Sequence, residues 1–160
     1  MLTKTKSAAS IAALFYSCKG DTMDNYFAPV MNRRDVNQIS ALGLAHCGDA
    51  VFELLVRTWL CTHGGVQAKD LHKRTVSFVS APAQAKRMDK LLPLLTEDEL
   101  SIYKRGRNAH SHHGIPKNAT HEEYSKATGL ECLFGSLYLL GQKDRIHELF
   151  LLTMEDDHAL

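Results

Sequence analysis

The apolar residues of this chain recur at intervals of three and four positions, which is the spacing of a helix with a buried face. The longest such run predicts one helix over residues 35–62, ended by Gly64 and Gly65. Its apolar positions form a broad band, so we expect this helix to be buried on most sides. No stretch alternates apolar and polar residues at the period of a β-strand. The pattern therefore predicts an all-α fold, a helical bundle.

Capping residues and prolines predict where the other helices begin and end. Thr96 and Thr120 are each followed three positions later by a glutamate, which is the pattern of a capping box at a helix N-terminus. Pro82 suits the first turn of a helix that Ser80 would cap. The expected helices cover residues 69–79, 80–92, 96–108, 120–140 and 144–153. Segment 109–118 contains glycine and proline without any periodicity, and we expect a loop there.

The length of 160 residues suits one domain with a hydrophobic core. We expect residues 1–30 to form a flexible N-terminal arm, 31–155 the folded domain and 156–160 a C-terminal tail, with Met23 as an alternative start of the chain. An apolar content of 44% is typical of soluble globular proteins, and no apolar run is long enough to span a membrane. Four cysteines without a CxxC pair favour a reducing compartment, so we expect a cytoplasmic protein.

Two acidic side chains lie inside otherwise apolar helical runs, Asp49 in the first long helix and Glu131 in the last but one. A buried ionised carboxylate is costly unless it has a partner, so such residues need a reason. Glycines, which disfavour a helix interior, accompany both acids. Gly48 precedes Asp49, and Gly129 and Gly135 flank Glu131. Close approach of the two helices at these glycines would explain them and would bring the carboxylates together.

Two neighbouring carboxylates repel each other, and a hard divalent cation is the usual remedy. Oxygen ligands with open positions favour Mg²⁺, for which Mn²⁺ can substitute. The alternative is that Asp49 and Glu131 each pair with an arginine or cap a loop. Arg57 lies four residues after Glu53 and suits that acid better than Asp49. The spacing alone leaves both interpretations open.

A basic segment, residues 104–117, lies between the two acids and contains no Asp or Glu. Its basic residues are Lys104, Arg105, Arg107 and Lys117. Lysine and arginine contacts to phosphates dominate affinity for duplex nucleic acid, and Asn108 can donate a further hydrogen bond. The segment has no aromatic residue, which disfavours single-strand binding by base stacking. The alternative is a solvated loop. His110, His112 and His113 match no zinc-binding spacing, and we interpret them as solvated loop histidines.

Two of these segments resemble the motifs of ribonuclease III enzymes. Residues 44–53, Leu-Ala-His-Cys-Gly-Asp-Ala-Val-Phe-Glu, resemble the family signature, and residues 131–135, Glu-Cys-Leu-Phe-Gly, resemble its second acidic motif. Further similar segments follow in the same order within residues 36–150, namely 70–73, 79–81 with 84–85, 104–109 and 116–118. The resemblance is greatest to the Mini-III branch, which has the nuclease domain without a double-stranded-RNA-binding domain.

The resemblance implies a ribonuclease III-like endonuclease fold and a homodimer with one site per subunit. It implies an Mg²⁺-dependent endoribonuclease that cuts double-stranded RNA to 5′-phosphate products, in the maturation of precursor large-subunit (23S) ribosomal RNA. Asp49 and Glu131 would be the catalytic and metal-binding residues, with Thr128 beside them. The residues that it implies for RNA binding are Lys73, Gln84, Lys104, Arg105, Arg107, Asn108 and Lys117.

The chain departs from full-length ribonucleases III, which carry additional acids at the positions of Leu42, Ala45 and Thr128. The Mini-III branch also lacks those acids, which leaves two acidic ligands per subunit. A second hypothesis is therefore a nuclease-derived protein that holds structured RNA without cutting it. Retention of Asp49 and Glu131 favours the enzyme, since a binding protein has no need of buried carboxylates. A third hypothesis, a helical protein-interaction domain with accidental motif matches, is disfavoured by the ordered set of motifs.

Overall fold

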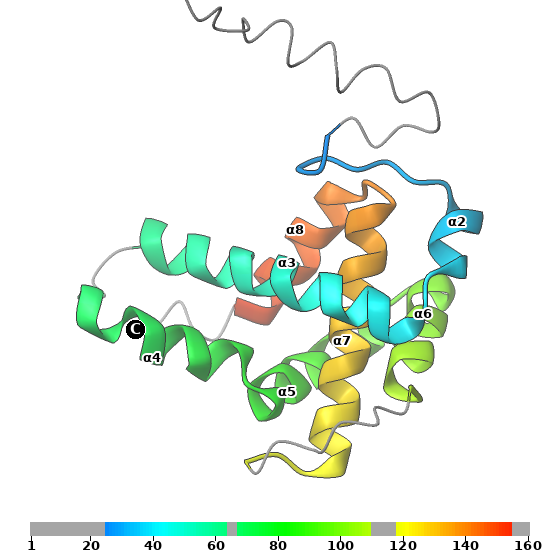
Figure 1. Cartoon of the computed structure of the whole chain (residues 1–160). Helices are drawn as coiled ribbons and strands as arrows, with labels where there is room; N and C mark the ends of the chain where they lie inside the picture. Colours follow the sequence, from blue (N-terminus) through cyan, green and yellow to red (C-terminus); the bar gives the residue numbers. More distant parts are fainter. Residues whose placement is uncertain (1–24, 64–66, 110–117, 155–160) are drawn as a thin grey trace, which may run out of the picture.

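The computed structural model describes residues 25–63, 67–109 and 118–154, and all regular secondary structure in these ranges is helical. The all-α prediction is therefore confirmed (Figure 1). In chain order the helices are α2 (Arg33–Gln38), α3 (Ala41–Thr62), α4 (Ala68–Val79), α5 (Ala81–Leu91), α6 (Glu97–Arg107), α7 (His121–Leu139) and α8 (Lys143–Met154), with a short 3₁₀ turn, η1 (Leu92–Leu94), after α5.

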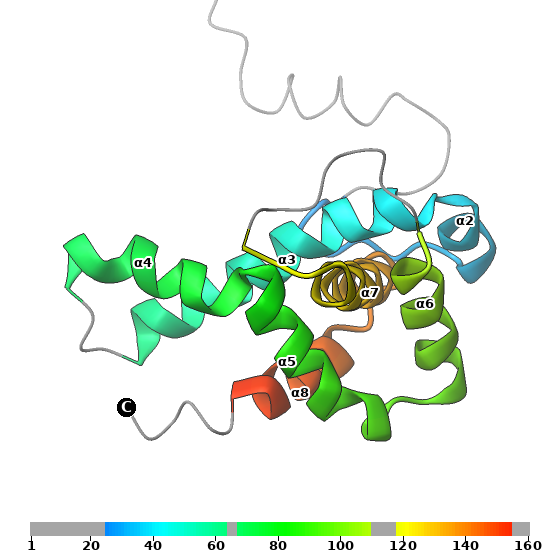
Figure 2. The ribbon, with the colours of Figure 1, turned by 90° about the horizontal axis from the view of Figure 1, so that it is seen from below.

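Helix α7 forms the centre of the bundle. Figure 2 views it along its axis, with α3, α6, α5 and α8 around it. Its most extensive contact is with α3, followed by those with α6 and α5. Between Ala127 and Leu137 every residue is buried except Glu131. A helix that is apolar on nearly all sides belongs in the core, which explains the central position of α7. The one residue of this stretch that is not buried is an acid.

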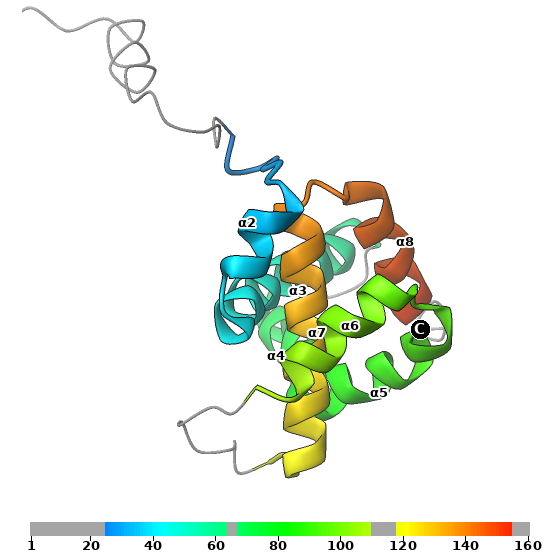
Figure 3. The same cartoon turned by 90° about the vertical axis from the view of Figure 1, so that its right-hand side faces the viewer.

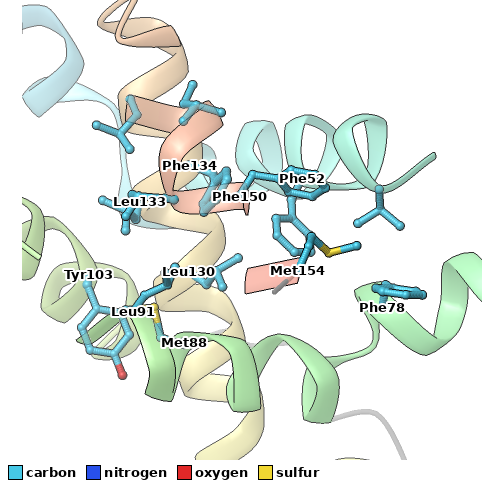
Figure 4. Packing of buried hydrophobic residues seen from close by; sticks show 14 of the residues in the cluster. Phe52, Phe78, Met88, Leu91, Tyr103, Leu130, Leu133, Phe134, Phe150 and Met154 are labelled. Atoms are coloured by element: carbon cyan, nitrogen blue, oxygen red, sulfur yellow. The ribbon is translucent and has the colours of Figure 1, made fainter. Parts of the chain in front are cut away.

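The hydrophobic core fixes how α3 crosses α7. Phe52 of α3 meets Phe134 of α7 edge to face with ring centroids 5.3 Å apart, and it meets Phe150 of α8 at 5.9 Å (Figure 4). Leu130 and Met154 belong to the same buried cluster. Edge-to-face pairs of this kind add about 0.5–1.5 kcal/mol beyond the burial of the rings. These contacts tie three helices together beside the acid of α7.

Both predicted capping boxes are present. Thr96 accepts a hydrogen bond from the Glu99 backbone N–H, and the Glu99 carboxylate accepts one of 2.8 Å from the Thr96 N–H. Thr120 and Glu123 repeat the arrangement at the start of α7. Glu99 also accepts hydrogen bonds of 2.8 and 2.9 Å from Arg145 of α8, and these bonds hold the pKa of Glu99 below its usual value. The boxes therefore set the starts of α6 and α7 as the sequence predicted.

The prediction of one helix over residues 35–62 is wrong at its N-terminal end. Ile39 is extended, with ψ of 135°, and separates the short α2 from α3. The Ser40 hydroxyl accepts a 3.0 Å hydrogen bond from the Gly43 N–H and caps α3. The Arg105 guanidinium of α6 donates to the Ile39 carbonyl. A local cap and a distant arginine thus stabilise a break that apolar periodicity does not reveal.

Helices α6 and α7 lie side by side (Figure 3). They approach closely at two glycines, Gly106 and Gly129. A Cβ at Gly129 would lie 2.5 Å from the Tyr103 ring, and a Cβ at Gly106 would overlap Cys132. The expectation that Gly129 serves the contact with α3 is therefore wrong, because this glycine accommodates α6.

Part of the expected N-terminal arm lies against α7. The Tyr138 hydroxyl of α7 donates a hydrogen bond to the carbonyl of Tyr26 in the arm, and Met31, directly after the arm, donates a 2.8 Å hydrogen bond from its N–H to the Leu139 carbonyl. The rest of the arm, residues 1–24, and the expected tail at 156–160 lie outside the described residues, so the domain division remains a prediction. Within the described ranges, no helix is long and apolar enough to cross a membrane.

Candidate active site

The backbones of α3 and α7 touch at Gly48 and Gly135. A Cβ at Gly48 would overlap the Glu131 carbonyl oxygen and would lie 2.6 Å from the Gly135 nitrogen. A Cβ at Gly135 would in turn overlap the carbonyl oxygen of Leu44. The expected close approach of the two helices is therefore present, and only glycine allows it at these two positions.

This crossing brings the Glu131 carboxylate within the influence of the Asp49 charge. Burial and, next in size, the negative charge of Asp49 raise the pKa of Glu131 from 4.5 to about 8. The surrounding protein therefore does not stabilise the two carboxylates in their charged forms at the same time. A cation bound between two such carboxylates would reduce this repulsion.

Asp49 is exposed, which corrects the expectation that both acids are buried. Partial desolvation and then Glu53 raise the pKa of Asp49, while His46 lowers it. Because the more exposed acid loses its proton more readily, Asp49 ionises first. Its negative charge then disfavours ionisation of Glu131. The two acids therefore have unequal surroundings, with Asp49 exposed and Glu131 half-buried.

The alternative in which arginines neutralise the acids has no support in the described part of the chain. The Arg57 guanidinium pairs with Glu53, one turn beyond Asp49. Lys126, five residues before Glu131 on α7, forms an ion pair of 2.8 Å with Asp89 of α5. Among the residues that the structure describes, no basic side chain forms an ion pair with Asp49 or Glu131.

The donor set fits a hard divalent cation. Asp49 and Glu131 offer carboxylate oxygens, the ligands that Mg²⁺ and Mn²⁺ prefer, once Glu131 has lost its proton. Over residues 25–63, 67–109 and 118–154, no group of three or more His, Cys, Asp or Glu side chains gathers as a metal cage. Mg²⁺ is usually bound through one or two carboxylates and keeps several waters, so two acids are a sufficient protein contribution.

Gln84, which the resemblance implied as an RNA contact, lies inside the protein. It is only 1% exposed, and neither atom of its side-chain amide has a hydrogen-bond partner. Its amide acts on Glu131 and works against the rise in that pKa, although the contact does not meet the geometry of a regular hydrogen bond. Leaving a buried polar group unpaired costs about 1–3 kcal/mol. The interpretation of Gln84 as an RNA-backbone contact is therefore corrected.

Thr128 lies one turn before Glu131 on α7 and is buried. Its hydroxyl donates a 2.9 Å hydrogen bond to the Tyr124 carbonyl of the same helix. The side chain is thus satisfied within α7 and contributes no charge to the acidic pair.

The residues expected to bind RNA differ in their exposure to solvent and in whether they already form hydrogen bonds within the protein. Lys104, Arg107 and Asn108 are exposed at the C-terminal end of α6, and Lys73 is exposed on α4. A cleft of about 580 Å³ between the end of α6 and the start of α7 includes Arg107 and Asn108, with His121, Glu122 and Ser125, in its lining. Arg105 is half-buried and already donates to Ile39, so its guanidinium is engaged within the protein. Lys117 and the histidines His110, His112 and His113 lie outside the described residues.

An apolar groove of about 620 Å³, which the sequence did not predict, runs along α3. Leu54 of α3 and Phe27 are 60% and 87% exposed beside it. Its lining consists of Tyr26, Phe27, His46, Cys47, Ala50, Val51, Leu54, Leu55, Tyr138, Lys143, Ile146 and His147. The expectation that α3 is buried on most sides is wrong for this face. The broad apolar band of α3 was the signal in the sequence for this groove, because the rest of the chain covers only part of that band.

The fold and the paired acids define a class of protein. Residues 42–142, which include both acids, match the Ribonuclease III domain family. The chain is 46% identical over 108 residues to the Mini-ribonuclease 3 of Symbiobacterium thermophilum, covering 68% of this chain and 82% of that protein. It is 45% identical over 118 residues to the Mini-ribonuclease 3 of Enterococcus faecalis, covering 72% and 89%. The chain therefore belongs to the Mini-ribonuclease 3 family, whose members are endoribonucleases of the ribonuclease III class.

A solved structure supports the same fold. The crystal structure of a Fusobacterium nucleatum protein superposes with a TM-score of 0.69 at 30% sequence identity, covering 77% of this chain and 98% of that one. The predicted ribonuclease III-like fold is thereby confirmed. The hypothesis of an interaction domain with accidental motif matches is wrong, because the similarity extends over most of the chain.

Proposed function

We propose that this endoribonuclease is Mg²⁺-dependent and hydrolyses phosphodiester bonds of double-stranded RNA. The observation that carries the proposal is the meeting of Asp49 and Glu131 at the α3–α7 crossing, with a pKa of about 8 for Glu131. Asp49 and Glu131 would hold the cation, and Mn²⁺ would substitute for Mg²⁺. Family resemblance implies 5′-phosphate and 3′-hydroxyl products.

The bound cation would activate water and neutralise charge on the scissile phosphate. The contribution of this chain is to present two carboxylates from two helices whose backbones are in contact. Glu131 would have to release its proton to act as a ligand, since protonated carboxyls bind cations poorly. Asp49, open to solvent, would keep the site accessible to the RNA backbone.

Duplex RNA is proposed as the substrate because the free basic residues suit phosphate contact without base stacking. Lys104, Arg107 and Asn108 are exposed together at the end of α6, and Lys73 lies on α4. Duplex RNA is recognised mainly by its shape, through phosphates and 2′-hydroxyls. Lys117 is proposed to act with them.

The enzyme is proposed to act as a homodimer. The apolar groove along α3 supports this, because an exposed apolar surface of this kind is typical of an interface. Family resemblance implies one site per subunit, each cutting one strand of the duplex.

The proposed physiological substrate is precursor large-subunit (23S) ribosomal RNA in the cytoplasm. This part depends on the resemblance to the Mini-III branch, because duplex recognition by shape does not select one RNA. Deletion of the gene is expected to leave the ends of 23S ribosomal RNA extended. Mature ends in the deletion strain would contradict this assignment.

The decisive experiment is incubation of the purified protein with long duplex RNA in Mg²⁺ and then in EDTA. Cleavage is expected only with the cation. Asp49→Asn and Glu131→Gln are expected to lose at least about 1,000-fold in rate, the equivalent of several kcal/mol, while still binding the duplex. Glu97→Gln, which removes an exposed acid of α6, is the matched control and should cleave normally. Binding without cleavage by the unaltered protein would favour the RNA-holding alternative.

A further inference from the structure

A polar cleft of about 580 Å³ lies where α6 ends beside the first turns of α7. A Cβ at Gly106, the last residue but one of α6, would lie within 3.0 Å of atoms of Thr128, Gly129 and Cys132. Helix α7 begins at His121, so its first two turns continue past the end of α6 (Figure 3). The cleft borders these two turns, which α6 does not cover.

The side of α7 that borders the cleft continues the side that packs on α6. Ser125 and His121 lie four and eight residues before Gly129, so the three residues lie on one side of the helix. Gly129 packs against α6, whereas His121 is exposed and Ser125 is half-buried. The Ser125 hydroxyl lies 3.5 Å from Nδ1 of His121. A hydroxyl and an imidazole, which can each donate or accept a hydrogen bond, therefore line this side of the cleft together.

The α6 side of the cleft carries positive charge. Arg107 and Asn108 line it from the end of α6, and both are exposed. Within residues 25–63, 67–109 and 118–154, no acid forms an ion pair with Arg107. The acid in the lining, Glu122, pairs with Lys126 at 3.2 Å. The cleft therefore offers a guanidinium charge beside hydrogen-bonding groups.

These groups match the chemistry of a ribose-phosphate unit. A guanidinium forms charge-assisted hydrogen bonds with phosphate oxygens. A 2′-hydroxyl both donates and accepts hydrogen bonds, and the adjacent Ser125 and His121 side chains can serve both functions. Duplex RNA is recognised through its phosphates and 2′-hydroxyls, and the 2′-hydroxyl is the group that distinguishes RNA from DNA.

We propose that this cleft binds a ribose-phosphate unit of duplex RNA, with Arg107 on the phosphate and Ser125 and His121 on the 2′-hydroxyl of the adjoining ribose. Ser125 and His121 are then specificity-determining residues, which select RNA by its hydroxyl. This inference rests on the proposed function, because it assigns a part of the same RNA-binding surface. It also gives a use to the polar groups on the uncovered side of α7.

The test compares two duplexes of one sequence, duplex RNA and its counterpart with fluorine in place of every 2′-hydroxyl. Fluorine removes the hydroxyl and keeps the A-form helix. Affinities are measured in EDTA, and the Tm of each protein verifies its fold. The unaltered protein is expected to prefer the RNA. Ser125→Ala and His121→Phe should each lower this preference about fivefold, the equivalent of one hydrogen bond, with unchanged affinity for the fluorinated duplex.

Three further variants separate the hydroxyl contact from other effects. Ser125→Thr retains a hydroxyl and should retain the preference for RNA. Arg107→Ala should weaken binding of both duplexes by the same factor, because both contain the phosphate. Ser101→Ala removes an exposed hydroxyl six residues before Arg107 on α6 and is the matched control, which should behave as the unaltered protein.

A preference for RNA that is unchanged in either Ser125→Ala or His121→Phe would overturn the inference and leave the proposed function intact. Equal affinity of the unaltered protein for the two duplexes would do the same. Failure of the unaltered protein to bind duplex RNA would overturn both.

Discussion

The carbonyl oxygen of Glu131 occupies the space in which any side chain at residue 48 would stand, so Gly48 and Glu131 meet backbone to backbone. The distance between the two acidic residues is therefore set by main-chain packing. The side-chain rotamers of Asp49 and Glu131 can change the separation of the two carboxylates only within the limits set by this backbone contact.

Replacement of Gly48 by alanine is expected to destabilise the fold by more than about 4 kcal/mol, because the new Cβ would meet backbone atoms of α7 that cannot move aside. Gly43→Ala is the matched control on the same helix. A Cβ there would lie 3.1 Å from side-chain atoms of Ile39 and Ser40 at an exposed position, and the gain of about 1 kcal/mol in helix propensity offsets that contact. Urea unfolding measures both. Equal stability of the two variants would refute the backbone contact.

Protonation of Glu131 makes stability in EDTA dependent on pH. The folded chain keeps this proton up to a pKa of about 8, whereas the unfolded chain loses it above about 4.5, so the folded state binds more protons between these values. Stability should therefore decrease as pH rises through that window. Glu131→Gln removes the effect, and its Tm should exceed that of the unaltered protein by an increasing margin, reaching about 2–4 °C or more at pH 8. Glu97→Gln should show no such trend, and a margin that shrinks with pH would contradict the raised pKa.

The same proton competes with the cation. Because Glu131 must ionise to bind a metal, Mn²⁺ affinity should strengthen with pH below the pKa of about 8, by about tenfold per pH unit if one proton is released. Calorimetric titrations at pH 6, 7 and 8 measure this slope. An affinity that is independent of pH over this range would mean that Glu131 is not a ligand.

Charge removal at the end of α6 should weaken RNA binding without affecting the fold. Lys104→Ala with Arg107→Ala is expected to lower duplex affinity and to flatten its dependence on salt by about one unit of slope for each phosphate that is no longer neutralised. Arg34→Ala removes an exposed charge from α2 and serves as the control. Filter binding at several salt concentrations measures the slopes, and unchanged slopes would exclude these residues from the RNA-binding surface.

A charge in the apolar groove should separate the subunits of the proposed dimer. Leu54 is 60% exposed, so Leu54→Glu should leave the fold of one chain intact while burying a carboxylate in any interface formed there. Leu151→Glu, at a position of α8 that is 40% exposed and outside the groove, is the control. Sedimentation is expected to show a monomer for Leu54→Glu and a dimer for the control. A dimer for both would place the interface elsewhere.

The sequence predicted what depends on neighbouring residues. The boxes at Thr96 and Thr120 form because each threonine and the glutamate three positions later satisfy each other's backbone N–H. The glycine beside Asp49 indicated a close helix approach because glycine is costly inside a helix without such a reason.

What the sequence did not predict depends on residues far apart along the chain. The break before α3 is stabilised in part by Arg105, 66 residues from Ile39. The burial of Gln84 follows from the packing of α5 against α7, and its own segment shows only a polar residue in a basic surrounding. The apolar groove along α3 forms because Tyr26, Phe27 and residues of α7 and α8 lie beside this helix without covering it.

The helix that presents Glu131 is also the helix on which the whole core is assembled. The acid therefore has no loop of its own that could open and close independently of the bundle. Fluctuations that displace this carboxylate require the packing around α7 to loosen, and such openings have free energies near that of global unfolding. The geometry needed for chemistry is thus preorganised by the same cooperative unit that keeps the protein folded.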